Sequence, residues 1–222
     1  MNLSGLRSSG LRRLVLLICQ IGLLHVGTLA SAQDNIRPKA RTNEPVATRW
    51  THQPGHRAWE QGAISALKTH ASGLVEMVPG DIRTWCPAYP DADDQARRAF
   101  WVGFLSALAK FESTYRETAI GGGGRWHGLL QILPGTARSY GCEARSGAAL
   151  RNGGANLSCA LRIMAVTVRR DGVVHGRGSS WQGVSADWGP MRSQSKRADI
   201  ANWTRSMPAC QSRRSLRPKA RP

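Results

Sequence analysis

Between residues 92 and 112 the large apolar side chains recur every three or four positions, the spacing of one face of an α-helix. Acidic residues gather at the start of this stretch, where they oppose the positive end of a helix dipole. The apolar stripe ends at Glu112, so the sequence predicts a buried helix that carries a carboxylate at its C-terminal end. The stripe consists of Phe100, Phe104, Leu105, Leu108 and Phe111, widened by Trp101, and the acids are Asp91, Asp93 and Asp94.

The other periodic segments are also helical, and none reads convincingly as a strand or an internal repeat. Pro134 suits the first position of a short helix that Gly141 stops. Asn156 can cap a longer helix over 157–170, with Gly172 beyond its end. Further helices are expected at 59–69, near Ser185 or Asp187, and at 198–207. The fold class that follows is all-α, with short or no β-structure.

The two ends of the chain differ in composition from the middle. Residues 1–32 combine three arginines, a thirteen-residue apolar run and Ala30-Ser31-Ala32, the pattern of a cleaved signal peptide. A retained N-terminal anchor is the alternative. Residues 33–58 are polar, basic and rich in proline, which predicts a flexible leader. The expected organisation is a signal peptide at 1–32, this leader, a single domain at 59–210 and a basic tail at 211–222.

The chain is strongly basic, with a formal net charge of +17. Without the first 32 residues, which hold three arginines and no acid, 28 basic residues face 14 acidic ones and the charge is +14. Such a protein is drawn to polyanions: nucleic acid, anionic lipid or an acidic cell-wall polymer. Export to the periplasm or beyond, and the lack of a recognition motif, argue against nucleic acid.

Four cysteines remain once the signal peptide, which holds Cys19, is removed. An even number in an exported protein suggests two disulfides, with three pairings open. Proximity along the chain favours Cys142 with Cys159 and Cys86 with Cys210. Their spacing does not suit a zinc site, and neither a metal nor a cofactor is expected. The glycine run 121–124 lacks the Gly-Lys-Ser/Thr ending of a phosphate-binding loop.

Several short motifs follow one another in an order that resembles the catalytic domain of the soluble lytic transglycosylases. The match covers roughly residues 95–210, and the sequence of motifs is much more specific than the Glu-Ser pair alone. The motifs are Phe111-Glu112-Ser113, Gly128-Leu129-Leu130-Gln131-Ile132, Pro134-Gly135-Thr136-Ala137, Asn156-Leu157-Ser158-Cys159-Ala160 and Trp188-Gly189-Pro190-Met191-Arg192.

The resemblance implies a lysozyme-like helical domain with a substrate cleft, acting on peptidoglycan glycan strands. Such enzymes cleave the β-1,4 bond between N-acetylmuramic acid and N-acetylglucosamine and leave a 1,6-anhydro ring. Glu112 would be the single catalytic acid and base. Ser113, Leu130 and Gln131 would help to bind the glycan, and Asn156 would brace the site. We expect a monomer, with association to the cell wall or a secretion machinery as a further partner hypothesis.

The residues themselves fit this chemistry. Glycoside cleavage commonly uses two carboxylates, but one suffices if the N-acetyl group of the substrate attacks the anomeric carbon. Glu112 must then be protonated for the first step, and burial against Phe111, Leu108 and the leucines of 128–132 would raise its pKa.

Alternatives remain open at this point. Asp187 as a second carboxylate would favour a lysozyme-type hydrolase that uses water, and a wall-binding module without catalysis is a third hypothesis. Many relatives carry a tyrosine near the last motif, but none follows Tyr140 here. Gln131 could line the site without a catalytic role, Asn156 could be only a helix cap, and His127 is interpreted as a half-exposed turn residue.

Overall fold

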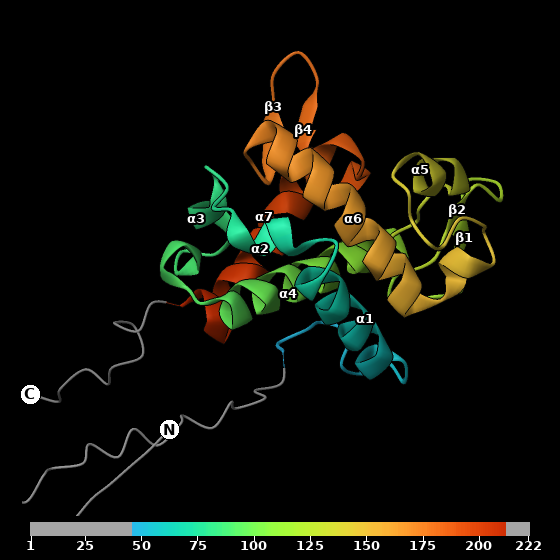
Figure 1. Ribbon diagram of the computed structural model, residues 1–222, viewed down its shortest axis with the longest axis horizontal. Coiled ribbons are helices and arrows are strands. Elements are labelled where there is room, and N and C mark those ends of the chain that lie inside the picture. Colours follow the sequence, from blue (N-terminus) through green and yellow to red (C-terminus); the bar gives the residue numbers. More distant parts are fainter. Residues whose placement is uncertain (1–45, 212–222) are drawn as a thin grey trace, which may run out of the picture. The chain divides into compact units, whose positions relative to one another are not determined.

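The computed structural model describes residues 46–211, which form a mainly helical domain with two small hairpins (Figure 1). The predicted all-α class is therefore confirmed. Its helices are α1 (His56–Lys68), α2 (Ser72–Glu76), α3 (Ile82–Trp85), α4 (Asp94–Glu112), α5 (Pro134–Ser139), α6 (Gly153–Asp171) and α7 (Gln194–Ser206). Its strands are β1 (Ile120–Gly121), β2 (Trp126–His127), β3 (His175–Arg177) and β4 (Trp181–Gly183). Short 3₁₀ helices are η1 (Tyr89–Asp91), η2 (Ala149–Arg151), η3 (Val184–Ala186), η4 (Gly189–Arg192) and η5 (Pro208–Cys210).

Helix α4 is the central element of the domain, in contact with α1, α2 and α7 (Figure 1). Every residue from Phe100 to Ala109 is buried, so the middle of the helix is enclosed on all sides. Asp93 caps its start by accepting a hydrogen bond from the Ala96 N–H at 2.9 Å. The helix begins two residues later than the pattern suggested and ends at Glu112, as predicted.

Helix α6 begins earlier than the sequence suggested. Its N-cap is Asn152, which accepts a hydrogen bond from Ala155 N at 2.9 Å, and Asn156 lies inside the first turns of the helix. The prediction that Asn156 caps this helix is wrong, because the backbone already turns helical at Gly153. Helix α6 packs closely on α1: a Cβ added to Gly62 would lie 2.8 Å from the Cα of Gly154.

The segment 46–55 is packed onto the domain, which moves the predicted boundary at residue 59. Trp50 is fully buried, and its indole donates to Glu60 of α1. The Arg49 N–H donates to the Ser106 hydroxyl in the middle of α4. The composition predicted a flexible leader here, but one buried tryptophan and these backbone contacts outweigh the prolines. The leader's residues 33–45 lie outside the described part of the chain.

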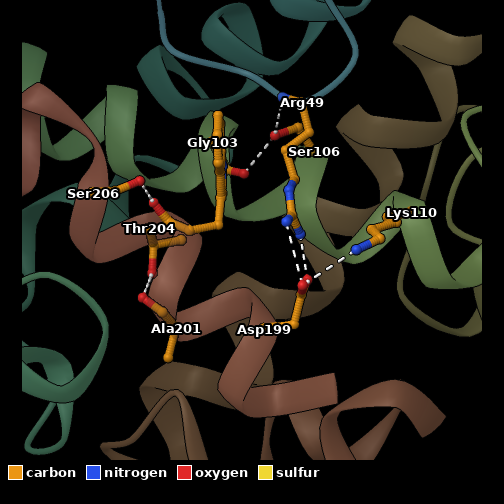
Figure 2. Close-up of polar contacts among 9 residues, drawn as sticks. Arg49, Gly103, Ser106, Lys110, Asp199, Ala201, Thr204 and Ser206 are labelled. Atoms are coloured by element: carbon orange, nitrogen blue, oxygen red, sulfur yellow. Dashed lines mark hydrogen bonds and ion pairs between the residues drawn. The ribbon is translucent and has the colours of Figure 1, made fainter. Parts of the chain in front are cut away.

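One carboxylate joins this N-terminal segment to two helices (Figure 2). Asp199 of α7 pairs with both guanidinium nitrogens of Arg49 and accepts from Lys110 of α4 at 3.2 Å. The Arg49 guanidinium holds the pKa of Asp199 below its usual range, with Lys110 adding to the effect and partial desolvation opposing it. The C-terminal end of α4 is thus linked to α7 through Lys110, and the segment 46–55 is linked to the same carboxylate of α7 through Arg49.

Both hairpins were missed by the sequence analysis, because strands of two or three residues, three of them containing glycine, carry little periodic signal. In β1–β2, Ile120 pairs with His127; in β3–β4, Arg177 pairs with Trp181. The β3–β4 hairpin is held by carboxylates at its base. Asp81 accepts from the backbone N–H groups of Val174 and His175, and Asp171 accepts from Gly183 N.

Two disulfides close the domain, with the pairing that proximity favoured: Cys86–Cys210 and Cys142–Cys159. They are the kind of crosslink that persists in oxidising compartments outside the cytoplasm. Within residues 46–211, no helix is long and apolar enough to cross a membrane. The same residues contain no group of three or more His, Cys, Asp or Glu side chains that could hold a metal ion. The predicted signal peptide and most of the basic tail lie outside the described residues.

Candidate functional site

The site is built around the last residue of α4. Glu112 ends the helix, and Ser113 caps it with its backbone N–H donating to Ala109 O at 3.1 Å. The next two residues, Thr114 and Tyr115, both adopt left-handed conformations with φ of 53° and 62°. Such conformations cost free energy for residues other than glycine and cluster at functional sites. The chain therefore turns sharply away immediately after the carboxylate.

The environment of Glu112 favours its protonated form. The side chain is partly buried, and no donor among residues 46–211 lies within hydrogen-bond distance of the carboxylate. Burial raises the pKa of Glu112 from 4.5 to about 7, against a smaller opposing effect of the Lys196 ammonium. A carboxyl group with this pKa can donate a proton near neutral pH and take one back.

The segment 128–132 is held in a tight loop by one buried side chain. The Asn156 carboxamide oxygen accepts from Leu130 N at 2.9 Å, and its amide nitrogen donates to His127 O and Leu150 O at 2.9 Å each. Gly128 has φ of +80°, and a Cβ there would lie 2.1 Å from Leu150 O. Only glycine fits this position, so the motif residues Gly128 and Asn156 form one structural unit.

The motif 188–192 contacts the same loop through Trp188. The Trp188 indole N–H donates to Leu130 O at 3.1 Å, and Trp188 is buried at the turn between η3 and η4. Leu130 therefore has both its backbone groups taken, one by Asn156 and one by Trp188. Three motifs that lie far apart in the sequence meet at this residue.

The predicted binding residues divide by exposure. Ser113, Leu130 and Asn156 are buried, with Leu130 and Asn156 at 0% exposure. The Ser113 hydroxyl donates to Ala109 O of α4, whereas the Asn156 side chain supports the loop. Gln131 is partly exposed; its amide nitrogen donates to Gly128 O at 2.8 Å and Ala119 O at 3.3 Å. Contact between any of the four residues and a glycan stays a prediction.

Two further acids, Glu117 close to Glu112 in the sequence and Asp187 beside the last motif, have different surroundings. Glu117 accepts from the Trp59 indole at 2.8 Å and from Gly153 N at 2.9 Å, which ties α1 to the start of α6. Asp187 is exposed as a residue, yet partial desolvation of its carboxyl group raises its pKa; the charges that oppose this are Arg170 and Arg192.

Tyr115 and Tyr140 also interact with residues other than Glu112. The Tyr115 ring meets His52 edge-on at 5.3 Å, and its hydroxyl lies in the field of Arg49 and Asp199. Tyr140 is close enough to Asp187 for that carboxylate to raise its pKa, after the larger effect of burial. Neither tyrosine has a hydrogen bond to Glu112 in the described structure.

Two lysines beside the acid were missed by the sequence analysis. The ammonium groups of Lys110 and Lys196 lie 5.1 Å and 5.5 Å from the centre of the Phe111 ring, directly before Glu112. Lys110 could have been noticed from its place in the last turn of α4. Lys196 could not, because only the packing of α7 on α4 brings it there.

No protein-family model matches the chain, and no curated protein sequence is similar to it. Among solved structures, the chain is similar to DslA from Bdellovibrio, at 27% sequence identity. The match covers 75% of this chain and 98% of DslA, with a TM-score of 0.69. A wild-type structure of DslA and a further variant match with TM-scores of 0.68 and 0.67. Two of the three structures carry a glutamate-to-glutamine substitution, each at a different position.

Proposed function

We propose that the protein is an exported lysozyme-like enzyme that acts on peptidoglycan, and more finely a lytic transglycosylase. The observation that carries the proposal is Glu112 at the end of α4, a partly buried carboxyl group with no hydrogen bond from any of residues 46–211, whose pKa burial raises to about 7. A wall-binding module without catalysis has no need of such a group. Substitution of glutamates by glutamine in DslA supports the view that carboxylates matter in this fold.

The chemistry follows from one carboxyl group. Protonated Glu112 gives its proton to the glycosidic oxygen as the bond from that oxygen to C1 of the muramic acid breaks. The carbonyl oxygen of the substrate's N-acetyl group attacks C1 from the opposite face. The Glu112 carboxylate then takes the proton of the 6-hydroxyl, whose oxygen displaces the N-acetyl oxygen and closes the anhydro ring. The proton lent in the first step is recovered in the second, so no water is consumed.

The main alternative is a hydrolase in which water attacks C1. In its common form such a hydrolase uses a second carboxylate across the sugar, and residues 46–211 offer no evident one. Glu117 accepts hydrogen bonds from Trp59 and Gly153, which connect α1 to the start of α6. The charges that act on Asp187 are those of Arg170 and Arg192 rather than that of Glu112. These surroundings favour the transglycosylase over the hydrolase.

The test is digestion of purified peptidoglycan by the protein without residues 1–32, with products identified by mass spectrometry. We expect anhydro-muropeptides from the native protein and none from Glu112→Gln. Glu143→Gln, a change of the same kind at an exposed glutamate, is the matched control and should remain active. Products with hydrated reducing ends would instead identify the hydrolase. Binding of peptidoglycan without any release would leave only the wall-binding module.

A further inference from the structure

Several cationic side chains lie on α7 or on the segments that contact it, and most of them are engaged. Arg49 and Lys110 share the carboxylate of Asp199 (Figure 2). Arg192 donates to the carbonyls of Ser185 and Ala186, and Arg197 donates to Met191 O at 3.0 Å; these are the contacts that hold η3, η4 and the start of α7 together. Each of these cations therefore has a structural role.

Lys196 is different. It lies in the first turn of α7, it is exposed, and among residues 46–211 no carboxylate lies within 4.0 Å of its ammonium group. Its contact is with the Phe111 ring, at 5.5 Å from the centre. An ammonium group has three protons, so a lysine that lies on an aromatic face can still bind an anion with the protons that point away from the ring.

The position of Lys196 helps neither the fold nor the proton on Glu112. A cation in the first turn of a helix faces the positive end of the helix dipole, and α7 has no acid there to offset it. The ammonium also favours the ionised form of Glu112, against the protonated form that a general acid needs. An uncommitted cation next to the acid is better explained by an anion that arrives with the substrate.

We propose that Lys196 binds a carboxylate carried on the 3-O substituent of the muramic acid at the scissile bond, so that the enzyme selects anionic glycan. This inference rests on the proposed function. Muramic acid differs from N-acetylglucosamine by its 3-O-lactyl group, which bears either a peptide with free carboxylates or, without the peptide, its own carboxylate. Both sources place the same chemical group near the bond that breaks.

Three forms of one soluble glycan test the proposal: peptide-bearing strands, the same strands with their peptide carboxylates converted to amides, and strands freed of peptide. We expect the native protein to cleave the peptide-bearing form with a kcat/KM roughly three- to tenfold above the amidated form, as for one partly exposed charge pair. In strands freed of peptide the lactyl carboxylate is no longer part of an amide bond. These strands should match the first form if Lys196 binds the lactyl carboxylate as well as a peptide carboxylate, and the second form if it binds only a peptide carboxylate.

The variants are Lys196→Met, Lys196→Arg and, as a matched control, Lys68→Met at an exposed lysine of α1. Lys196→Met should bring the ratio between the anionic and amidated forms to about one, while Lys196→Arg and Lys68→Met should keep it. The pH above which activity falls could be higher in Lys196→Met while the ratio of kcat/KM between the anionic and amidated forms stays unchanged. Lys196 would then act only through Glu112, and the proposal would be overturned. An equal loss on all three glycans would overturn it as well.

Failure of this inference is distinguishable from failure of the proposed function. If the native protein cleaved the peptide-bearing and amidated forms with equal kcat/KM and cleavage still required Glu112, only the role of Lys196 would be refuted. No cleavage of any glycan would refute both.

Discussion

Glu112 combines a functional requirement with a cost to the folded state. Its burial keeps the carboxyl group protonated near neutral pH, as a general acid requires. The same burial makes the ionised form expensive, because the charge is taken partly out of water and no side chain or backbone group of residues 46–211 donates a hydrogen bond to it. The activity should therefore fall as pH rises through about 7, and so should the stability.

The stability effect has a definite sign. A carboxyl group whose pKa is raised on folding binds its proton more tightly in the folded state. Its contribution is fully present below pH 4.5, the unfolded value, and is lost as pH rises through about 7. Glutamine at this position stays neutral at every pH. Glu112→Gln should therefore match the native protein near pH 4 and exceed its free energy of unfolding above pH 7, by on the order of 3 kcal/mol.

Urea unfolding of both proteins between pH 4 and pH 8.5 measures this difference directly. The free energy of unfolding of Glu143→Gln, a variant at an exposed side chain, should stay close to that of the native protein over the same pH range. A Glu112→Gln difference that stays constant with pH would mean that the carboxyl group does not titrate as a buried acid, and the mechanism would lose its general acid.

At the scale of elements, the loop 128–132 depends on one helix that presents two asparagines. Asn152 is exposed and caps α6, whereas Asn156, one turn later, is fully buried and makes three hydrogen bonds, to Leu130 in the loop, to His127 just before it and to Leu150 of η2. The same substitution should have opposite consequences at the two positions. This offers a matched test of what the motif asparagine does.

We expect Asn156→Asp to lower the free energy of unfolding by roughly 3–5 kcal/mol, because a buried charge would face two carbonyl oxygens that have lost their donor. Asn152→Asp should change it by less than about 1 kcal/mol, in the stabilising direction, since aspartate caps a helix equally well and suits its dipole. Thermal unfolding at pH 7 compares them. If both variants lost the same free energy of unfolding, Asn156 would have no role in holding the loop 128–132.

These elements also show how far the sequence could predict the fold. Helix α4 was predictable because its apolar spacing and the acids at its start are local signals. The start of α6 was not, since Asn152 and Asn156 both suit a helix start. They are distinguished by the contacts of Asn156 with Leu150 and with His127 and Leu130, the last two of which lie more than twenty positions away. Trp50 and Lys196 are similar cases: the burial of one and the position of the other beside Glu112 come from packing, which no local pattern records.

At the scale of the whole molecule, the two disulfides restrain very different lengths of chain. Cys86–Cys210 joins the end of α3 to η5 across 124 positions and so encloses the central helix, the candidate site and α7. Cys142–Cys159 closes only 17 positions, between α5 and the middle of α6. All four cysteines are buried to a similar degree, so replacing either pair by alanine removes comparable packing.

The difference in loop length predicts a difference in stability. In the chain-entropy account, a crosslink stabilises by restricting the unfolded chain, by about 3 kcal/mol for the short loop and about 5 kcal/mol for the long one. The double variant Cys86→Ala/Cys210→Ala should therefore be less stable than Cys142→Ala/Cys159→Ala by about 2 kcal/mol in urea unfolding without reductant. If the short-loop variant proved the weaker, the disulfide beside α5 would be acting on the folded state around the loop 128–132, and peptidoglycan cleavage should then fall with it.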